Sequence, residues 1–275
     1  NNINASSEIT IYSDTKWDED KINNNFDKLH YIIIDGTTSI PNNAFKQTSN
    51  LISVVLPDGV TSIGDHAFWY CTNLESIHIP ESVTSIGEAA FGTCFDLKQI
   101  SSPTIDTYTE NEIKIPDHIT SIGSRAFRQA GRSIVTKYIL PNNLTTIPSA
   151  CFQECRALES IEIPRSVTSI GSAAFNECIE LHTVTFEANS LLETIGNSAF
   201  ALSGKLTSFP FEDLSLLTTI GNDAFNCSSS SNSGLTGTIT IPNRVTTIGD
   251  DCFYECNITE LIFEDDSSLN TIGEE

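Results

Sequence analysis

The chain has 275 residues, with 36 acidic against 14 basic side chains and a formal net charge of −22 at pH 7. This charge disfavours binding to nucleic acid and to anionic membrane surfaces, because both repel a polyanion. No segment approaches the roughly 20 consecutive apolar residues of a membrane helix, so we expect no membrane insertion. The polar run at residues 1–4 is compatible with a trimmed leader, so targeting signals leave the compartment open.

The first 28 residues differ from the pattern that fills the rest of the chain. Residues 8–12 alternate polar and apolar side chains, which predicts a strand. A short amphipathic helix with Trp17 on its apolar side is expected next, capped by Ser13 or Asp14. We interpret residues 1–28 as an N-terminal cap that covers the exposed core of the first repeat.

From residue 29 onward the chain repeats one unit. Each unit has an isoleucine with a phenylalanine five residues later, and the nine pairs are Ile40/Phe45, Ile63/Phe68, Ile86/Phe91, Ile122/Phe127, Ile147/Phe152, Ile170/Phe175, Ile195/Phe200, Ile220/Phe225 and Ile248/Phe253. Successive isoleucines are 23 to 36 residues apart, a period typical of a solenoid. We therefore expect one domain over residues 29–275, with nine full coils and a truncated tenth at Ile272. Because the tenth unit lacks its phenylalanine, we expect a longer natural protein or a disordered tail beyond Glu275.

Each coil contains three kinds of segment. A run with apolar residues at alternate positions predicts a strand, and a proline such as Pro80 often ends it. The V-T-S-I run predicts a second, shorter extended segment, and the following glycine is expected to supply the φ freedom of a tight corner. Segments such as residues 64–71 predict helical turns with one apolar side. The predicted fold class is α/β: a right-handed solenoid with a parallel sheet on one face and short helices or 3-10 turns on the other.

One step of the repeat is longer than the others. Ile86 and Ile122 are 36 residues apart, which leaves an insertion of about 13 residues relative to the shortest period. We place this insertion roughly between Ser101 and Asn111. A solenoid accommodates such a segment as a loop on one face, so we expect the coils to continue in phase on either side of it.

The unit L-x-x-I-x-I-P-x-x-V-T-S-I-G-x-x-A-F-x-x-C resembles the leucine-rich repeat, and more closely its BspA-like subtype. Residues 74–94 and 158–178 carry every position of this motif, and the resemblance covers residues 29–275. The asparagine that follows the strand in common leucine-rich repeats is missing, so no asparagine ladder is expected. The resemblance implies an exposed or secreted protein that binds other molecules through its solenoid, often as an adhesin. Such proteins occur in mucosa-associated bacteria and some protozoan parasites.

Eight cysteines call for a test of disulfide and metal chemistry. Five of them stand eight residues after the repeat isoleucine: Cys71, Cys94, Cys155, Cys178 and Cys256. Residues at one repeat position stack as a column with parallel Cβ vectors, so disulfides would close poorly, and we interpret these cysteines as small buried apolar residues. The C-x-x-x-C pairs, Cys151/Cys155 and Cys252/Cys256, lack further ligands. We therefore expect no metal site and no cofactor.

The five histidines do not cluster in the sequence. His78 stands between two inward strand residues, and Val55 and Lys114 are expected at the equivalent outward positions of the neighbouring coils. This row offers His78 neither a carboxylate nor a nucleophile as a partner. No phosphate-binding loop, zinc-protease motif, nucleophile elbow or EF-hand pattern occurs in the chain. We therefore expect no enzyme; a metal-dependent or hydrolytic enzyme that uses His78 or the cysteine pairs is kept as an alternative.

The outward strand positions form the most informative surface. Serine and threonine dominate it, with an apolar and aromatic patch towards the N-terminal end. Solenoids use an extended sheet face for binding, so we expect ligand contacts from Tyr31, Ile33, Val55, His78, Lys114 and Lys137. The alternative is that serine and threonine only satisfy β propensity on a wetted face.

These observations favour a non-enzymatic binding scaffold. We expect an adhesin-type protein, at the cell surface or secreted, that engages a host or matrix protein or a glycan through its sheet face. A structural spacer that displays another domain is the second interpretation. Truncations tested for binding would separate the two, because a spacer has no binding activity of its own.

Overall fold

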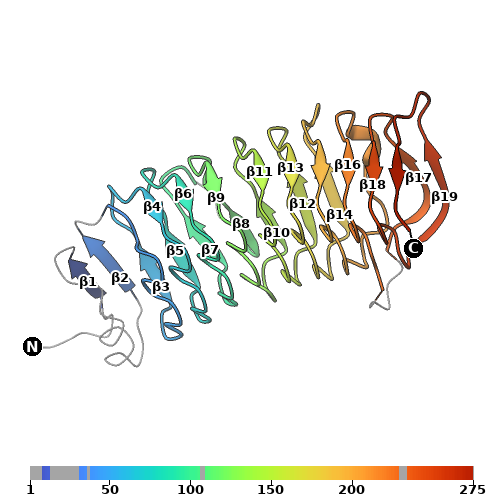
Figure 1. Ribbon diagram of the computed structural model, residues 1–275. Coiled ribbons are helices and arrows are strands. Elements are labelled where there is room, and N and C mark those ends of the chain that lie inside the picture. The colour runs from blue at the N-terminus through green and yellow to red at the C-terminus, as the bar shows by residue number, and fades with distance from the viewer. Residues whose placement is uncertain (1–7, 13–30, 36–37, 106–108, 229–233, 275) are drawn as a thin grey trace, which may run out of the picture.

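The computed structural model describes residues 8–12, 31–35, 38–105, 109–228 and 234–274, which form one elongated stack of coils (Figure 1). A typical coil contributes a longer strand, a two-residue strand and a run of tight turns. Every strand pair in these ranges is parallel, and each strand pairs with its counterpart in a neighbouring coil. The solenoid and the parallel sheet that the repeat predicted are therefore confirmed.

The longer strands lie side by side and form what we call the sheet face. They are β1 (Glu8–Tyr12), β2 (Tyr31–Asp35), β3 (Ser53–Val55), β5 (Ser76–His78), β7 (Gln99–Ser101), β8 (Glu112–Lys114), β10 (Lys137–Ile139), β12 (Ser160–Ile163), β14 (Thr183–Phe186), β17 (Thr236–Ile241) and β19 (Asn257–Phe263). In a three-residue strand such as β5, Ile77 is buried and the residues on either side of it point outward. This alternation follows from the two-residue period of a strand.

The sheet face is divided into three sheets. Their strand orders are β1-β2-β3-β5-β7, β8-β10-β12-β14 and β17-β19. Between β14 and β17 the equivalent segment, which contains Pro210, forms no strand; the short 3-10 helix η1 (Phe211–Asp213) follows it. Proline has no N–H to donate to a ladder, so its presence accounts for this interruption.

The two-residue strands form a second face. They are β4 (Ser62–Ile63), β6 (Ser85–Ile86), β9 (Ser121–Ile122), β11 (Thr146–Ile147), β13 (Ser169–Ile170), β15 (Thr194–Ile195), β16 (Thr219–Ile220), β18 (Thr247–Ile248) and β20 (Thr271–Ile272). The glycine that follows a repeat isoleucine donates its N–H to the carbonyl of the repeat isoleucine in the preceding coil. Gly171 N–H, for example, donates to Ile147 O at 2.7 Å. Pro148 takes the glycine's place after β11 and lacks this donor, which accounts for the break between β9 and β11.

The predicted α/β class is wrong, because the third face consists of turns. In residues 64–71, the N–H groups of residues 66, 68 and 70 donate to carbonyls of the next coil at 2.7 to 2.9 Å. The N–H groups between them donate three residues back along the chain, and His66 and Tyr70 have φ of 57° and 65°. An α-helix needs every N–H bonded four residues back, and a helix this short is marginal by itself. Hydrogen bonds to the next coil therefore decide the conformation.

The predicted role of the repeat glycines is also wrong. Positive φ angles occur at His66 and Tyr70 and at the equivalent residues of other coils, but not at Gly87 or Gly196. A Cβ atom built on Gly196 would lie 2.7 Å from the backbone nitrogen of Ser172 in the preceding coil. These glycines are needed because the two backbones approach too closely for any side chain.

The core is one continuous apolar column. The nine repeat phenylalanines stack on one another, with 5.2 to 5.8 Å between neighbouring ring centroids. Eight of the nine side chains are almost fully buried, from Phe45 to Phe225. Burying one such side chain is worth roughly 1.5–3 kcal/mol, so the column is a major source of stability. The phenylalanines found at one repeat position in the sequence therefore form one interior column.

The long repeat step contains an additional strand. β7 pairs with β5, and β8 pairs with β10, but β7 and β8 belong to different sheets. On the second face β6 pairs directly with β9, and Phe91 stacks on Phe127 with ring centroids 5.5 Å apart. The sheet face thus gains one strand where the other faces continue uninterrupted. The described residues of the predicted insertion, 102–105 and 109–111, form turns and no strand, but the strand β7 just before them was not predicted.

The first strand of the chain is confirmed. β1 pairs in parallel with β2, with Ile9 opposite Ile32 and Ile11 opposite Ile34. The predicted capping helix lies outside the described residues, as does most of the predicted cap. Tyr31 and Ile33 stand at alternate positions of β2, and Ile33 pairs with Val55.

Candidate binding surfaces

The structure pairs three of the six predicted ligand-contacting residues with one another across adjacent strands. Ile33 pairs with Val55, Val55 pairs with His78, and His78 pairs with Ser101 of β7. Lys114 belongs to the same row but lies beyond the break between β7 and β8, so it is not the residue next to His78 as predicted. β7 was missed because Ser102 stands where most of the other strands have their second inward apolar residue, although Pro103 follows at the usual position of the proline.

The two remaining residues lie in the neighbouring row. Tyr31 stands at the first position of β2, and Lys137 pairs with Glu112 across the strands. Lys137 also lines a depression of 170 Å³ with Asn142, Glu162 and Glu187. The lysines are therefore surrounded by carboxylates, whereas Val55 and His78 lie among small polar side chains.

His78 has a hydrogen-bonding partner but no catalytic one. Its Nδ1 lies 3.0 Å from the Ser101 hydroxyl, and a similar contact of 2.9 Å joins the hydroxyls of Ser53 and Ser76. In the described part of the chain, no three His, Cys, Asp or Glu side chains converge in a way that could hold a metal ion. The geometry at His78 is that of a hydroxyl ladder on a sheet surface.

The cysteines complete the core's hydrogen bonding. Each of the five column thiols donates to the carbonyl of a phenylalanine in the preceding coil, for example Cys71 to Phe45 O at 2.9 Å and Cys94 to Phe68 O at 3.1 Å. Ser203 makes the same contact with Phe175 O at 3.0 Å. Burial raises the pKa of the Cys71 thiol to about 12, so it is protonated and unreactive at neutral pH. All eight cysteines are free, as predicted.

The turn face carries an aromatic cluster that the sequence reasoning missed. It consists of His66, Trp69, Tyr70 and Phe95, and neighbouring ring centroids are 5.4 to 6.5 Å apart. Tyr70 is 44% exposed, and the ammonium of Lys46 lies 5.0 Å from the Trp69 ring. An alignment of the coils at their isoleucines would have revealed the cluster. It places Trp69, Tyr70 and Phe95 at outward turn positions in adjacent units.

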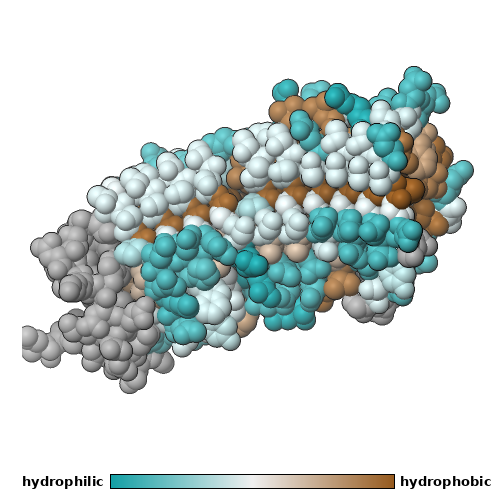
Figure 2. All heavy atoms as spheres, in the orientation of Figure 1, coloured by the Kyte–Doolittle hydropathy of each residue, from teal (hydrophilic) through white to brown (hydrophobic). Residues whose placement is uncertain are grey.

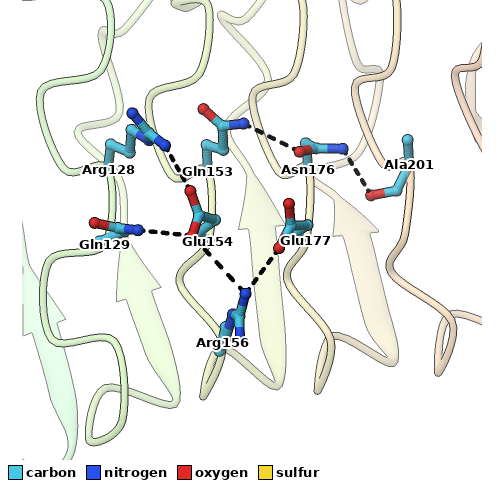
Figure 3. A network of polar contacts seen from close by, with 8 residues as sticks. All are labelled: Arg128, Gln129, Gln153, Glu154, Arg156, Asn176, Glu177 and Ala201. Atoms are coloured by element: carbon cyan, nitrogen blue, oxygen red, sulfur yellow. Dashed lines mark hydrogen bonds and ion pairs between the residues drawn. The ribbon is translucent and has the colours of Figure 1, made fainter. Parts of the chain in front are cut away.

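Three arginines, Arg128, Arg132 and Arg156, gather beside this cluster; we call them the arginine corner. Arg128 donates to Glu154 at 2.6 Å, and Arg156 contacts Glu177 at 2.9 Å and Glu154 at 3.9 Å (Figure 3). Burial of Glu154 disfavours its charge, but hydrogen bonds from Arg128 and Gln129 outweigh this and lower the pKa of its carboxyl group. The network links adjacent coils.

Phe95, Arg132, Ser133 and Arg156 line a shallow depression of 390 Å³ next to the network. Phe95 comes from the coil before the insertion, Arg132 and Ser133 from the coil after it, and Arg156 from the one following. All four stand at the corner between the turn face and the sheet face. Only the stacking of coils brings them together.

The visible surface combines hydrophilic patches, pale rows and hydrophobic regions (Figure 2). On the face turned to the viewer, pale rows of intermediate hydropathy run along the molecule, with a hydrophobic line between them (Figure 2). Among the residues that the structure describes, no helix has the length and hydropathy needed to cross a bilayer.

Comparison with known proteins identifies the repeat. The model of the BspA type leucine-rich repeat region matches residues 38–111, 106–232 and 217–275. A solved leucine-rich repeat protein from Bacteroides ovatus is 25% identical, with a TM-score of 0.54 over 90% of this chain and 71% of its own. One from T. pallidum is also 25% identical, with a TM-score of 0.53 over 64% of this chain and 77% of its own. No curated protein sequence matches the chain.

Proposed function

The chain belongs to the BspA-type leucine-rich repeat family, and we propose on that premise that it is a non-enzymatic binding scaffold of adhesin type, secreted or held at the cell surface. Its partner is a host or matrix protein or a glycan, bound on the sheet face. The observation that carries this proposal is the register of the outward side chains, which align in rows across neighbouring strands. Such rows offer an extended surface of fixed spacing, which is how solenoids bind large ligands.

The chemistry of the rows supports recognition and gives no support to catalysis. Val55 and His78 supply apolar and aromatic contact area, and the flanking serine and threonine hydroxyls supply adaptable hydrogen bonds. Interfaces concentrate their energy in a few such anchors, surrounded by contacts of little individual weight. The sheet face therefore has the composition of a binding surface with its anchors near the N-terminal end.

The test is saturable binding to a panel of purified extracellular-matrix proteins and glycans, measured on a biosensor. We expect at least a tenfold loss of affinity in the variant Val55→Ala/His78→Ala/Lys137→Ala, because its anchors on the sheet face are removed. The matched control is Ser62→Ala/Ser85→Ala/Ser169→Ala, which changes the second face and should bind within twofold of the parent chain. Circular dichroism checks that both variants fold.

Two outcomes would contradict the proposal. Binding of a matrix protein or an uncharged glycan that survives the sheet-face changes would place the interface elsewhere on the molecule. No saturable binding to any member of the panel would favour the spacer that displays another domain.

A further inference from the structure

The depression at the arginine corner has the features of a ligand site, and it is separate from the sheet face. We propose that it binds an acidic saccharide, with the ligand's carboxylate or sulfate on Arg132 and Arg156 and a sugar ring on Phe95. Its 390 Å³ is lined by these three side chains and Ser133. A volume of this order suits one or two sugar units.

The arginine corner concentrates positive charge in an acidic protein. The chain carries a net charge of −22 and has only six arginines, yet three of them meet at this corner. They face two carboxylates, those of Glu154 and Glu177, so one positive charge is left uncompensated. Arg132 makes no ion pair within the residues that the structure covers. The Arg132 guanidinium, which has no carboxylate at ion-pair distance in the described structure, attracts an anionic group.

Arg156 is held in place before a ligand arrives. Figure 3 shows the Arg156 side chain directed towards Glu154 and Glu177, and Arg128 and Gln129 approaching Glu154 from the preceding coil. Both contacts of Arg156 use the same nitrogen, Nη2, and its buried Nε makes no hydrogen bond in the described part of the chain. The guanidinium group is thus oriented by its two carboxylate partners. Such preorganisation reduces the entropy lost on binding.

An aromatic surface continues from the depression. Phe95 is half-buried, and its ring centroid lies 6.5 Å from that of the exposed Tyr70. The Tyr70 ring in turn contacts the ring of Trp69, with 5.4 Å between the two ring centroids. Aromatic rings present apolar faces against which the C–H faces of a sugar can pack, while the hydroxyl of Ser133 can bond to sugar hydroxyls. A bound chain could therefore extend from the arginines over these rings.

The charge of the whole molecule narrows the class of ligand. A densely charged polyanion such as a nucleic acid would be repelled by the surrounding carboxylates, including the exposed Asp96 next to Phe95. A saccharide with an isolated acidic group avoids that repulsion and uses both the guanidinium groups and the rings. An acidic peptide would use the arginines alone, so the rings favour the saccharide.

The experiment is titration calorimetry of the folded chain with four probes. A hyaluronan tetrasaccharide and a sulfated chondroitin tetrasaccharide carry isolated carboxylates or added sulfates, chitotetraose has the same length without charge, and tetraglutamate is the acidic peptide. We expect at least one acidic saccharide to bind saturably and chitotetraose not to bind. Because the contacts are charge-assisted, affinity should fall as salt rises from 50 to 200 mM.

Variants then test the residues. We expect Arg132→Gln to weaken binding at least tenfold and Arg132→Lys to give an intermediate loss, since lysine keeps the charge but not the fork of donors. Phe95→Leu should weaken binding through loss of the ring. Arg244→Gln, an exposed arginine elsewhere on the solenoid, is the matched control and should bind within twofold of the parent chain. Arg132 makes no ion pair to lose in the described structure, so its variants should fold normally.

Three results would overturn the proposal: no binding of either acidic saccharide at millimolar concentration, equal binding by Arg132→Gln, or tetraglutamate binding as tightly as the saccharides. The sheet-face variant described above should bind the saccharides normally. Failure at the arginine corner and failure of the sheet-face proposal are therefore distinguishable.

Discussion

At the scale of the residue, position in the stack determines what each side chain does. Gly196 has an ordinary backbone conformation, and it is glycine because the preceding coil lies 2.7 Å from where a Cβ atom would stand. Cys178 donates to the carbonyl of Phe152 at 3.2 Å, so its thiol is a hydrogen-bond donor as well as an apolar filler. In both cases the reason for the residue lies one coil away.

Close approach at Gly196 predicts that any side chain is harmful there. We expect Gly196→Ala and Gly196→Asn each to lower the free energy of unfolding by about 1–3 kcal/mol, because neighbouring coils must separate to admit the new atoms. Urea unfolding followed by circular dichroism measures this. Ser172→Ala, at the exposed neighbour, is the control and should stay within about 0.5 kcal/mol. Full stability in Gly196→Asn would instead mean that φ freedom was the requirement.

At the scale of the element, hydrogen bonds between coils replace those within a helix. The positive-φ pair seen at His66 and Tyr70 recurs four residues apart in other coils, as at Ala173 and Glu177. Ala173 N–H donates to Asn197 O in the next coil at 2.8 Å. The left-handed residues direct alternate N–H groups along the stack, and this satisfies backbone groups that a short helix would leave unpaired at its ends.

The turn geometry makes a prediction opposite to that of a helix. In a helix interior Ala→Gly costs about 1 kcal/mol, but Ala173 has φ of 56°, where glycine has no steric penalty. We expect Ala173→Gly to keep or raise the free energy of unfolding, and Ala173→Val to lower it by about 1–2 kcal/mol. Ala174→Gly, at the buried neighbour without a positive φ, should be destabilising. Thermal and urea unfolding measure all three; a clear loss in Ala173→Gly would contradict the turn assignment.

At the scale of the whole molecule, stability depends on contacts between neighbouring coils. The phenylalanine column runs unbroken past the insertion, whereas the strand ladders break between β7 and β8 on the sheet face and between β9 and β11 on the second face. The two breaks lie in adjacent coils. The aromatic core and the hydrogen bonds of the turn face therefore continue where the two strand ladders are interrupted.

This arrangement predicts where the solenoid opens first. We expect backbone amides of β8, β9 and β11 to exchange with deuterium faster than those of β12 and β13, because local opening there breaks fewer hydrogen bonds. Hydrogen exchange followed by mass spectrometry gives the protection of each segment. Strand β20 provides an internal reference for fraying at the end of the described coils. Equal protection across the two breaks would show that the aromatic column alone sets local stability.

Much of the architecture could be predicted from the sequence because each coil repeats the same apolar spacing. The isoleucine and phenylalanine positions predicted the solenoid, the parallel pairing and the aromatic column, and prolines marked the ends of strands. These features depend on the regular spacing of apolar residues, which can be read directly from the sequence. The predicted helices failed because periodicity within residues 64–71 cannot distinguish a helical turn from turns bonded to the next coil.

The binding surfaces divide in the same way. Alternation along each strand predicted which residues face outward on the sheet, including Val55 and His78. Only the tertiary structure placed Ser101 beside His78, and only it assembled Phe95, Arg132 and Arg156 from three coils into one depression. Sequence by itself determined the unit and its inward side, because burial recurs at fixed intervals. Only the stacking of coils of unequal length decided which residues of different coils lie next to one another on the surface. Their proximity depends on insertions that shift one coil relative to the next.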